Sequence, residues 1–393
     1  MRVELLSAYR AVENEVCALG RSVVHYYTKD TLRNTLVTYA AIKAVVLLGA
    51  VLVSLRLQPA ALMQNPVFLA RWDGGWYQGI AYQGYAFNYP NSAAFPPMYP
   101  LLIKILSVNQ PTLMPVIEVL ISNAFSFLGL YYLYKLVPLV INERYRLRVC
   151  FAYMVFPVLL VCNLVSYSEP IFLTFTIGAY YYWKRQRFGY AALFAIFSIF
   201  TRQVGALILV IFIVDAVYGY FARRKRSHVK ELAVIVATCV GVGLLYVFYF
   251  LRFGNPLIVS SVEAANWKGS LSAVNIINNV INYGLQTPPL VPFNYAIVPI
   301  FLVDGLLVVA TVLALVKRDV ALATYSFVSL AVSAALSTWP DSFVRLIAAI
   351  FPIYLFLGLM LSNDWRKNLV IGIIAVVIAM QNLFIWISGA WLY

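Results

Sequence analysis

The run TLVTYAAIKAVVLLGAVLVSL at residues 35–55 carries one charge, Lys43, and is long enough to cross a bilayer as a helix. Similar apolar runs follow it along the chain of 393 residues, which is 63% hydrophobic and only 11% charged. Soluble globular chains are about 45–50% apolar and about 25% charged. The sequence therefore predicts an all-α polytopic membrane protein and excludes an ordinary cytosolic enzyme.

The predicted transmembrane helices are separated by basic clusters and prolines, and we expect a bundle of about 11 of them. They cover residues 35–55, 113–137, 148–165, 169–183, 188–202, 204–221, 231–251, 295–316, 320–337, 343–361 and 368–389.

Basic residues predict the orientation of this bundle. They gather in alternate connections, which hold Arg144, Arg146 and Arg148, then Lys184, Arg185 and Arg187, then Arg223–Arg226, Lys317 and Arg318, and Arg366 and Lys367. Cytoplasmic loops carry an excess of Lys and Arg, so these connections and the amino terminus are predicted inside and the carboxyl terminus outside. We interpret Arg223–Arg226 as a topology anchor, with a site for lipid headgroups or nucleic acid as the alternative. The net charge of +14 then needs no nucleic-acid partner.

The chain divides into an amino-terminal segment and one membrane domain. Residues 1–34 contain an apolar stripe at helical spacing, which predicts an amphipathic helix on the inner membrane surface. The stripe consists of Leu5, Tyr9, Val12, Val16, Leu19 and Val23. Residues 35–391 form the single predicted transmembrane domain.

Two outer connections, 56–112 and 252–294, are far longer than simple turns, and loops of this size are usually functional. The first contains a half-length apolar stretch, Tyr99–Val108, between prolines. This stretch is too short to span and predicts an interfacial or re-entrant helix. We therefore expect the chemistry on the outer face, with 56–112 as the catalytic loop and 252–294 as a loop of the donor or acceptor site.

The first outer loop contains Arg71-Trp72-Asp73-Gly74-Gly75-Trp76-Tyr77. A carboxylate in this position suits a general base that takes a proton from an attacking hydroxyl. The two glycines permit a tight turn, and the aromatic rings offer apolar faces at the interface. The alternative is that Asp73 caps a helix or pairs with Arg71, with the tryptophans as an ordinary aromatic belt.

Few other charged residues are predicted near the outer face, and ionisable groups at such depth are costly and often functional. Arg202 and Arg345 suit a phosphate through charge-assisted hydrogen bonds, while snorkelling to headgroups is the alternative for each. The remaining outer charges are Glu169, Arg252, Glu263, Lys268 and Asp341. Lys43 and Asp304 fall inside spans, and we interpret them as a structural pair.

Several sites are excluded by the residues that are missing. The sequence has no Walker A loop, no G-x-G-x-x-G, no H-E-x-x-H and no Cys/His cluster, and both histidines, His25 and His228, are predicted inside. The sequence therefore predicts no metal site and no cofactor, and it excludes a Ser-His-Asp hydrolase on the outer face.

The motifs resemble those of the PIG-V family, the GPI mannosyltransferase 2 family. The resemblance covers about residues 70–370 and rests on Arg71–Tyr77, Phe95–Leu101, Tyr167–Phe172, Thr201–Gly205, Phe253–Leu257, Trp267 with Lys268, and Arg345 ahead of Phe351 and Pro352.

This resemblance implies a GT-C glycosyltransferase fold and no cofactor. The enzyme would transfer a hexose, most often mannose, from a polyprenyl- or dolichyl-phosphate donor to a glycolipid or lipid-linked glycan acceptor. It implies Asp73 as the base, Arg202 and Arg345 as phosphate ligands, and Glu169 as a sugar ligand or second carboxylate. Further substrate-binding positions would be Arg71, Trp72, Trp76, Tyr77, Tyr99, Trp267 and Lys268. The compact chain suits a prokaryotic homologue in a plasma membrane; a eukaryotic one would lie in the endoplasmic reticulum, with a lumenal site.

Two other functions fit a chain that binds prenyl phosphates. One is a transporter or flippase of lipid-linked sugars, which should show paired broken helices in two related halves, but no internal repeat is visible. The other is a noncatalytic subunit of a glycosylation complex.

Overall fold

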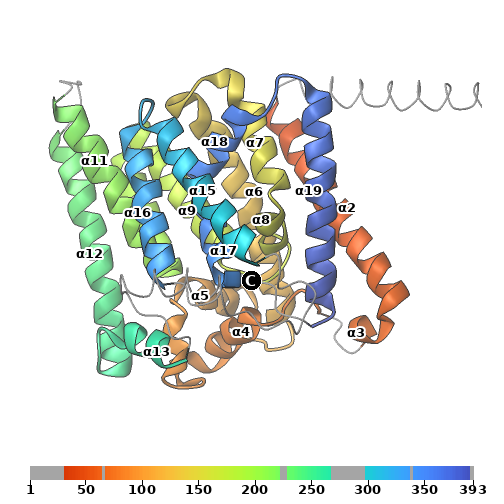
Figure 1. Cartoon of the computed structure of the whole chain (residues 1–393). Coiled ribbons are helices and arrows are strands. Elements are labelled where there is room, and N and C mark those ends of the chain that lie inside the picture. The colour runs from red at the N-terminus through yellow and green to blue at the C-terminus, as the bar shows by residue number, and fades with distance from the viewer. Residues whose placement is uncertain (1–30, 64–66, 222–227, 267–296, 337–339, 390–393) are drawn as a thin grey trace, which may run out of the picture.

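The computed structural model describes residues 31–63, 67–221, 228–266, 297–336 and 340–389, which form helices and turns without a β-strand (Figure 1). Five helical stretches in these ranges are long and apolar enough to cross a membrane. They are α2 (Leu32–Leu57), α6 (Met114–Val140), Gln203–Phe221, α12 (His228–Phe253) and α19 (Trp365–Ile387). All five fall on predicted spans, which confirms an all-α, integral, multi-pass membrane protein.

Shorter apolar helices complete the bundle at the positions of other predicted spans. They are α9 (Glu169–Lys184), α10 (Phe188–Thr201), α15 (Ile297–Leu315) and α16 (Val320–Leu336). The longer stretch Gln203–Phe221 consists of the 3₁₀ turn η4 (Gln203–Leu207) and α11 (Ile208–Phe221). Helix α9 is buried on all sides from Glu169 to Tyr180, as expected for a helix that is apolar all round and lies in the middle of a bundle.

Two predicted spans are each broken into two helices. Residues 148–165 form α7 (Arg146–Val155) and α8 (Pro157–Cys162), while 343–361 form α17 (Pro340–Ala348) and α18 (Pro352–Met360). Pro157 and Pro352 stand in the first turn of the second helix in each pair, where the missing N–H is harmless. Phe156 is extended, with φ −61° and ψ 113°, as residues before proline usually are.

The non-helical segment 163–168 joins α8 to α9 inside the bundle, and polar side chains satisfy its backbone. Lys43 Nζ donates to the Asn163 carbonyl at 2.7 Å, and Ser122 Oγ donates to the Tyr167 carbonyl at 2.7 Å. Ser166 N donates to the Leu69 carbonyl at 3.1 Å. Irregular backbone at membrane depth is tolerated only where it is paired in this way. These partners therefore fix the segment that leads to Glu169.

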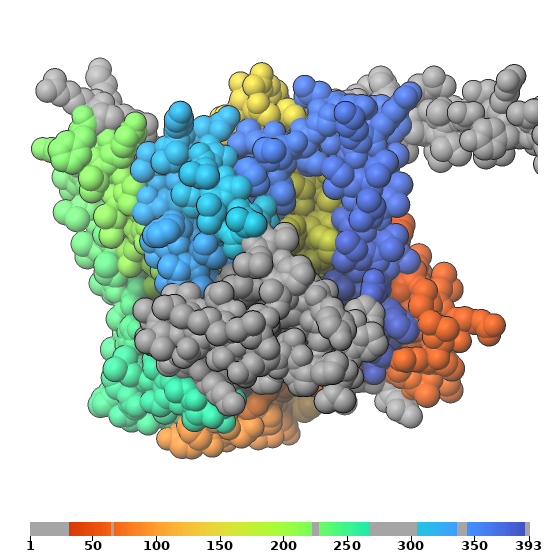
Figure 2. Space-filling model, viewed as in Figure 1, coloured from red at the N-terminus to blue at the C-terminus, as the bar shows by residue number. Residues whose placement is uncertain are grey.

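Four short helices gather at one end of the bundle, at the bottom of Figure 1: α3 (Pro59–Met63), α4 (Asp73–Gln83), α5 (Met98–Leu106) and α13 (Ile258–Asn266). Helix α5 corresponds to the predicted half-length helix. Helix α13 and the 3₁₀ turn η2 (Asn91–Ala94) lie side by side on the lower surface (Figure 2), where Asn266 Nδ2 donates to Asn91 Oδ1 at 2.7 Å. The two long predicted outer loops thus meet at the same end.

Three expectations involve residues outside the description. The amphipathic segment 1–30 and the basic run Arg223–Arg226 are not described, and neither is the side chain of Asp304. The predicted pair of Lys43 with Asp304 is therefore untested. Lys43 Nζ instead has described partners in the Asn163 carbonyl and, at 2.8 Å, Ser126 Oγ.

Candidate active site

The start of α4 presents Asp73 at the short-helix end of the bundle. Trp72 precedes it with φ 54°, and the turn is closed by bonds from Gly74 N to the Arg71 carbonyl (2.9 Å) and from Gly75 N to the Trp72 carbonyl (3.0 Å). The N-cap position is held by Trp72, so Asp73 lies in the first turn of the helix and is not its cap.

Arg71 lies beside Asp73 in sequence but has different partners. Its Nη1 donates to the Ile387 carbonyl at 2.9 Å and its Nη2 to the Ala61 carbonyl at 3.2 Å. These bonds join the turn before α4 to the end of α19 and to α3. The described partners of Arg71 are backbone carbonyls, so the alternative in which Arg71 pairs with Asp73 is wrong. These contacts hold the turn before α4 in position.

Gly74 lies where α4 closely approaches α6 and the non-helical segment 163–168. A Cβ at this position would lie 2.3 Å from Ser166 Oγ and 2.7 Å from Glu118 Oε1, closer than real contacts allow. Glu118 is fully buried on α6; its Oε1 accepts from Gln78 Nε2 at 2.7 Å, and its Oε2 has no hydrogen-bond partner among the described residues. The sequence analysis did not select Glu118. It is nevertheless an isolated carboxylate in an apolar run, and such residues are often functional.

A chain of ion pairs joins four residues from four separate elements. Asp73 Oδ2 lies 2.7 Å from Arg345 Nη1, Arg345 Nε lies 3.1 Å from Glu169 Oε1, and Arg202 Nη1 lies 2.5 Å from the same Glu169 oxygen. The side chains are mostly buried, from 1% exposed for Glu169 to 18% for Asp73. Two carboxylates and two guanidinium groups balance in charge, which makes this burial tolerable.

Local structure brings Glu169 and Arg202 together. Glu169 begins α9, and a carboxylate is favoured in the first turn of a helix. Arg202 follows the last turn of α10 in an extended conformation, and its Nη1 also donates to Ser168 Oγ at 3.2 Å. Arg345 lies over the ring of Tyr167 at 4.7 Å, a cation–π contact. The two arginines thus meet at one carboxylate.

Aromatic side chains of α4, which begins with Asp73, pack against Phe95 and α5. Trp76 stacks on Phe95 at 5.1 Å, and the rings of Tyr77 and Tyr99 lie 4.6 Å apart. Tyr99 is fully buried and donates to the Glu118 carbonyl at 2.7 Å, so it joins α5 to α6. Trp72, in contrast, is 41% exposed.

Tyr77 connects these aromatic side chains to the residues of the ion pairs. Its hydroxyl donates to Ser168 Oγ at 3.0 Å. Burial raises the pKa of Tyr77, and the negative charge of Asp73 raises it further. The phenol therefore stays neutral at physiological pH and serves as a hydrogen-bond donor.

Glu263 on α13 belongs to the same electrostatic environment. Burial raises its pKa, while Arg202 and Arg345 lower it and Asp73 raises it. A residue from the second long loop therefore lies within electrostatic reach of the ion pairs. The sequence had placed Glu263 among the outer charges without assigning it a role.

Two predicted site residues, Trp267 and Lys268, lie outside the described residues. Within the ranges that the structure describes, no group of three or more His, Cys, Asp or Glu side chains could hold a metal ion. The described ion pairs consist of two carboxylates and two guanidinium groups.

Comparisons with known proteins identify the fold. No family profile matches the chain, and no curated protein sequence is similar to it at a significant level. The structure is similar to that of the oligosaccharyltransferase AglB from the archaeon Archaeoglobus fulgidus, solved with an inhibitory peptide and a dolichol-phosphate. The TM-score is 0.53 at 13% sequence identity, over 92% of this chain and 56% of that chain.

Two crystal structures of the Archaeoglobus fulgidus oligosaccharyltransferase align less well. The apo form gives a TM-score of 0.47 at 12% identity, and the form tethered to an acceptor peptide gives 0.46 at 13%, each over 89% of this chain and 55% of that one. At such identities the likeness with AglB concerns the fold, and this chain spans just over half of that protein's length. The predicted all-α membrane bundle therefore has a fold similar to that of this oligosaccharyltransferase.

Proposed function

We propose that this protein is a membrane glycosyltransferase that moves a hexose, most often mannose, from a polyprenyl- or dolichyl-phosphate donor to a hydroxyl of a membrane-associated glycan. The observation that carries the proposal is the chain of ion pairs from Asp73 through Arg345 and Glu169 to Arg202. It places one carboxylate that can accept a proton beside two cations that can hold a phosphate, at the end of the bundle predicted to lie outside.

The chemistry needs few groups, because polyprenyl phosphate is already a good leaving group. Asp73 takes the proton from the acceptor hydroxyl as that oxygen attacks the anomeric carbon. Arg202 and Arg345 stabilise the charge that develops on the departing phosphate. The new glycosidic bond forms as the bond to phosphate breaks, so a single displacement inverts the anomeric configuration.

The fold adds support of a general kind. A protein with the same fold was solved with a dolichol-phosphate bound, which is the class of lipid carrier proposed here. The likeness does not identify the acceptor of this chain, because the related protein was solved with an inhibitory peptide. The resemblance of Arg71–Tyr77 to the PIG-V signature favours a glycan acceptor and a mannosyl donor.

Replacing Asp73 by asparagine tests the proposal. Asp73→Asn keeps the shape of the side chain but removes the base, so turnover should fall by about 10²–10⁴-fold while donor binding persists. The measurement is transfer of labelled mannose from polyprenyl-phosphate mannose to a membrane lipid extract, with Glu143→Gln at the opposite end of the bundle as the matched control.

The same assay separates the other functions. A flippase would move the labelled donor across a vesicle membrane without forming a glycosidic bond, and Asp73→Asn would leave that movement intact. A noncatalytic subunit would show neither activity when purified alone. Full transfer activity in Asp73→Asn would exclude Asp73 as the base.

A further inference from the structure

The carboxyl-terminal end of α19 reaches the short-helix end of the bundle, where the candidate site lies (Figure 1). Trp386, in the last turn of this helix, is fully buried and contacts the surroundings of the site in two places. It lies outside residues 70–370, which the PIG-V resemblance covers. A buried tryptophan combines a large apolar ring with a single N–H donor, so it can hold two neighbours in two different ways.

The first contact is a hydrogen bond to the segment that leads into α4. Trp386 Nε1 donates to the Phe68 carbonyl at 2.9 Å. Arg71 Nη1 donates in the opposite direction, to the Ile387 carbonyl at 2.9 Å. The Arg71 carbonyl in turn accepts from Gly74 N in the turn that begins α4. The two bonds therefore tie the last turn of α19 to the backbone from which α4 starts.

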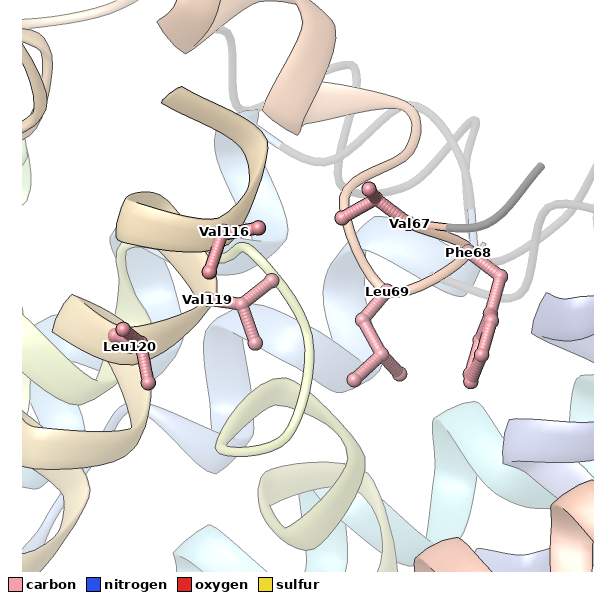
Figure 3. Close-up of a pocket in the computed structure, with 6 residues that line it drawn as sticks. All are labelled: Val67, Phe68, Leu69, Val116, Val119 and Leu120. Atoms are coloured by element: carbon pink, nitrogen blue, oxygen red, sulfur yellow. The ribbon is translucent and has the colours of Figure 1, made fainter. Parts of the chain in front are cut away.

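The segment 67–69 lacks close packing on its α6 side. An apolar groove of 140 Å³ separates it there from the start of α6 (Figure 3). The groove is lined by Val67, Phe68, Leu69, Val116, Val119 and Leu120. Atoms that border such a space lack the dispersion contacts that packed neighbours provide. Hydrogen bonds from Trp386 and from Ser166 N, which donates to the Leu69 carbonyl, therefore matter more for the position of this segment.

The second contact is with the ring that supports Arg345. The rings of Trp386 and Tyr167 meet edge to face, with their centroids 5.3 Å apart and an angle of 79° between their planes. The guanidinium carbon of Arg345 lies 4.7 Å from the centroid of the same Tyr167 ring. Arg345 Nη1 is 2.7 Å from Asp73 Oδ2. The Trp386 ring thus acts on the guanidinium through one intervening side chain.

The N–H of Trp386 supports the Asp73 side of this ion pair, and its ring supports the Arg345 side. We propose that Trp386 is a positioning residue, which fixes the carboxylate of Asp73 relative to the guanidinium of Arg345. The inference rests on the proposed function for its effect on turnover. Its effect on the turn that begins α4 can be measured without turnover.

Two tryptophan-to-phenylalanine variants form a matched pair for the test. Trp386→Phe keeps an aromatic ring against Tyr167 but removes the N–H donor. Trp183→Phe is the control: Trp183 is 1% exposed, and its Nε1 donates to Asp215 Oδ2 at 2.7 Å. It lies near the end of α9 opposite to Glu169, away from the site. Each variant breaks one buried hydrogen bond, so both should unfold at a lower temperature than the wild type.

The kinetic measurement is transfer of labelled mannose from polyprenyl-phosphate mannose, normalised to folded protein. Trp386→Phe should lower kcat by about 10- to 100-fold, since a misplacement of about 1 Å caused by a distant mutation can cost about 10²-fold. The donor KM should stay near wild type, because both arginines of the site remain. Trp183→Phe should change neither constant. Equal kcat values in the two variants would show that Trp386 is only structural.

The second measurement is hydrogen–deuterium exchange of the amides of Gly74 and Gly75, which close the turn at the start of α4. They should exchange several-fold faster in Trp386→Phe and at the wild-type rate in Trp183→Phe. Arg71→Met removes the opposite bond and should accelerate the same amides, which keeps the test decisive if Trp386→Phe does not fold. Unchanged exchange in Trp386→Phe, or in Arg71→Met where that is the variant measured, would overturn the inference. If the wild-type protein transfers nothing, the proposed function fails, and exchange still decides whether α19 holds this turn.

Discussion

Arg345 contacts both carboxylates of the site, through Nη1 to Asp73 and through Nε to Glu169. The guanidinium reaches the two carboxylates with two nitrogens fixed in one plane, a geometry that a lysine ammonium does not reproduce. Arg202 contacts Glu169 alone among the ion pairs of the site. The two arginines therefore share Glu169, but only Arg345 also pairs with Asp73.

Replacing Arg345 should consequently lower activity even when the positive charge is kept. We expect Arg345→Ala to lower kcat by about 10²–10³-fold, the cost of losing a preorganised donor, and to raise the donor KM. Arg345→Lys should recover only part of the loss, because the bidentate fork is absent. Steady-state kinetics with labelled donor measures both constants, with Arg144→Lys at the opposite end as the control. Wild-type constants in Arg345→Ala would show that the guanidinium only packs against Tyr167.

Gly74 and Gly75 are adjacent in sequence but should respond differently to alanine. A Cβ at position 74 collides with Ser166 and Glu118, whereas a Cβ at position 75 meets nothing within 4 Å. Gly74→Ala should destabilise the protein by about 1–3 kcal/mol through overpacking and lower kcat by displacing Asp73. Gly75→Ala should leave both near wild type. Thermal unfolding and turnover of the two variants give the comparison, and equal behaviour would contradict the close approach.

Part of the site could be predicted from the sequence because outer charges are so few. Asp73, Glu169, Arg202 and Arg345 could be selected by depth and charge alone. Their pairing could not, since Arg345 and Asp73 are 272 positions apart and meet only through the packing of α4 against the bundle. Glu118 was missed because its partners, Gln78 and Gly74, lie on a different element.

At the scale of elements, hydropathy located the helices but not their breaks. Apolar residues continue through 148–165 and 343–361, so composition alone merges two short helices into one span. The prolines at 157 and 352 are visible in the sequence, yet a break inside a membrane also needs polar partners for the freed backbone. For the irregular segment 163–168 that follows α8, such partners come from α2 and α6, far away in sequence.

Lys43 is one of these partners, and replacing it should lower both the stability of the protein and the activity of the candidate site. Lys43→Met keeps the length of the side chain but leaves the Asn163 carbonyl without its donor, a loss of about 1–3 kcal/mol for a buried polar group. We expect a lower unfolding temperature in detergent and a lower kcat, because the freed segment 163–168 leads directly to Glu169. Lys104→Met, at an exposed position, is the control. A more stable and fully active Lys43→Met would show that the buried charge costs more than its hydrogen bonds contribute.

At the scale of the whole molecule, the short helices occupy one end of the bundle and the basic turn η3 (Glu143–Tyr145) the other (Figure 1). The excess of Lys and Arg predicts that the η3 end is cytoplasmic. A reporter inserted after Gly269 should therefore be protected from cytosolic reagents, and one after Lys225 should be accessible. The reverse pattern would place the candidate site on the cytoplasmic side and would remove the topological argument for an extracytoplasmic transferase.

The alternation of carboxylate and guanidinium along Asp73, Arg345, Glu169 and Arg202 has a consequence for the course of one reaction cycle. In the proposed reaction, Asp73 loses its negative charge as it accepts the proton, and at the same moment the departing phosphate gains one. The proton and the excess negative charge thus move in opposite directions, and the total charge of the cavity stays the same during the transfer step. Arg345 loses its first partner just when a new anion forms nearby, so it can follow the charge from carboxylate to phosphate. When Asp73 later gives up its proton to solvent water, it competes with the phosphate for that arginine, and the polyprenyl phosphate is released as the pair of Asp73 with Arg345 forms again.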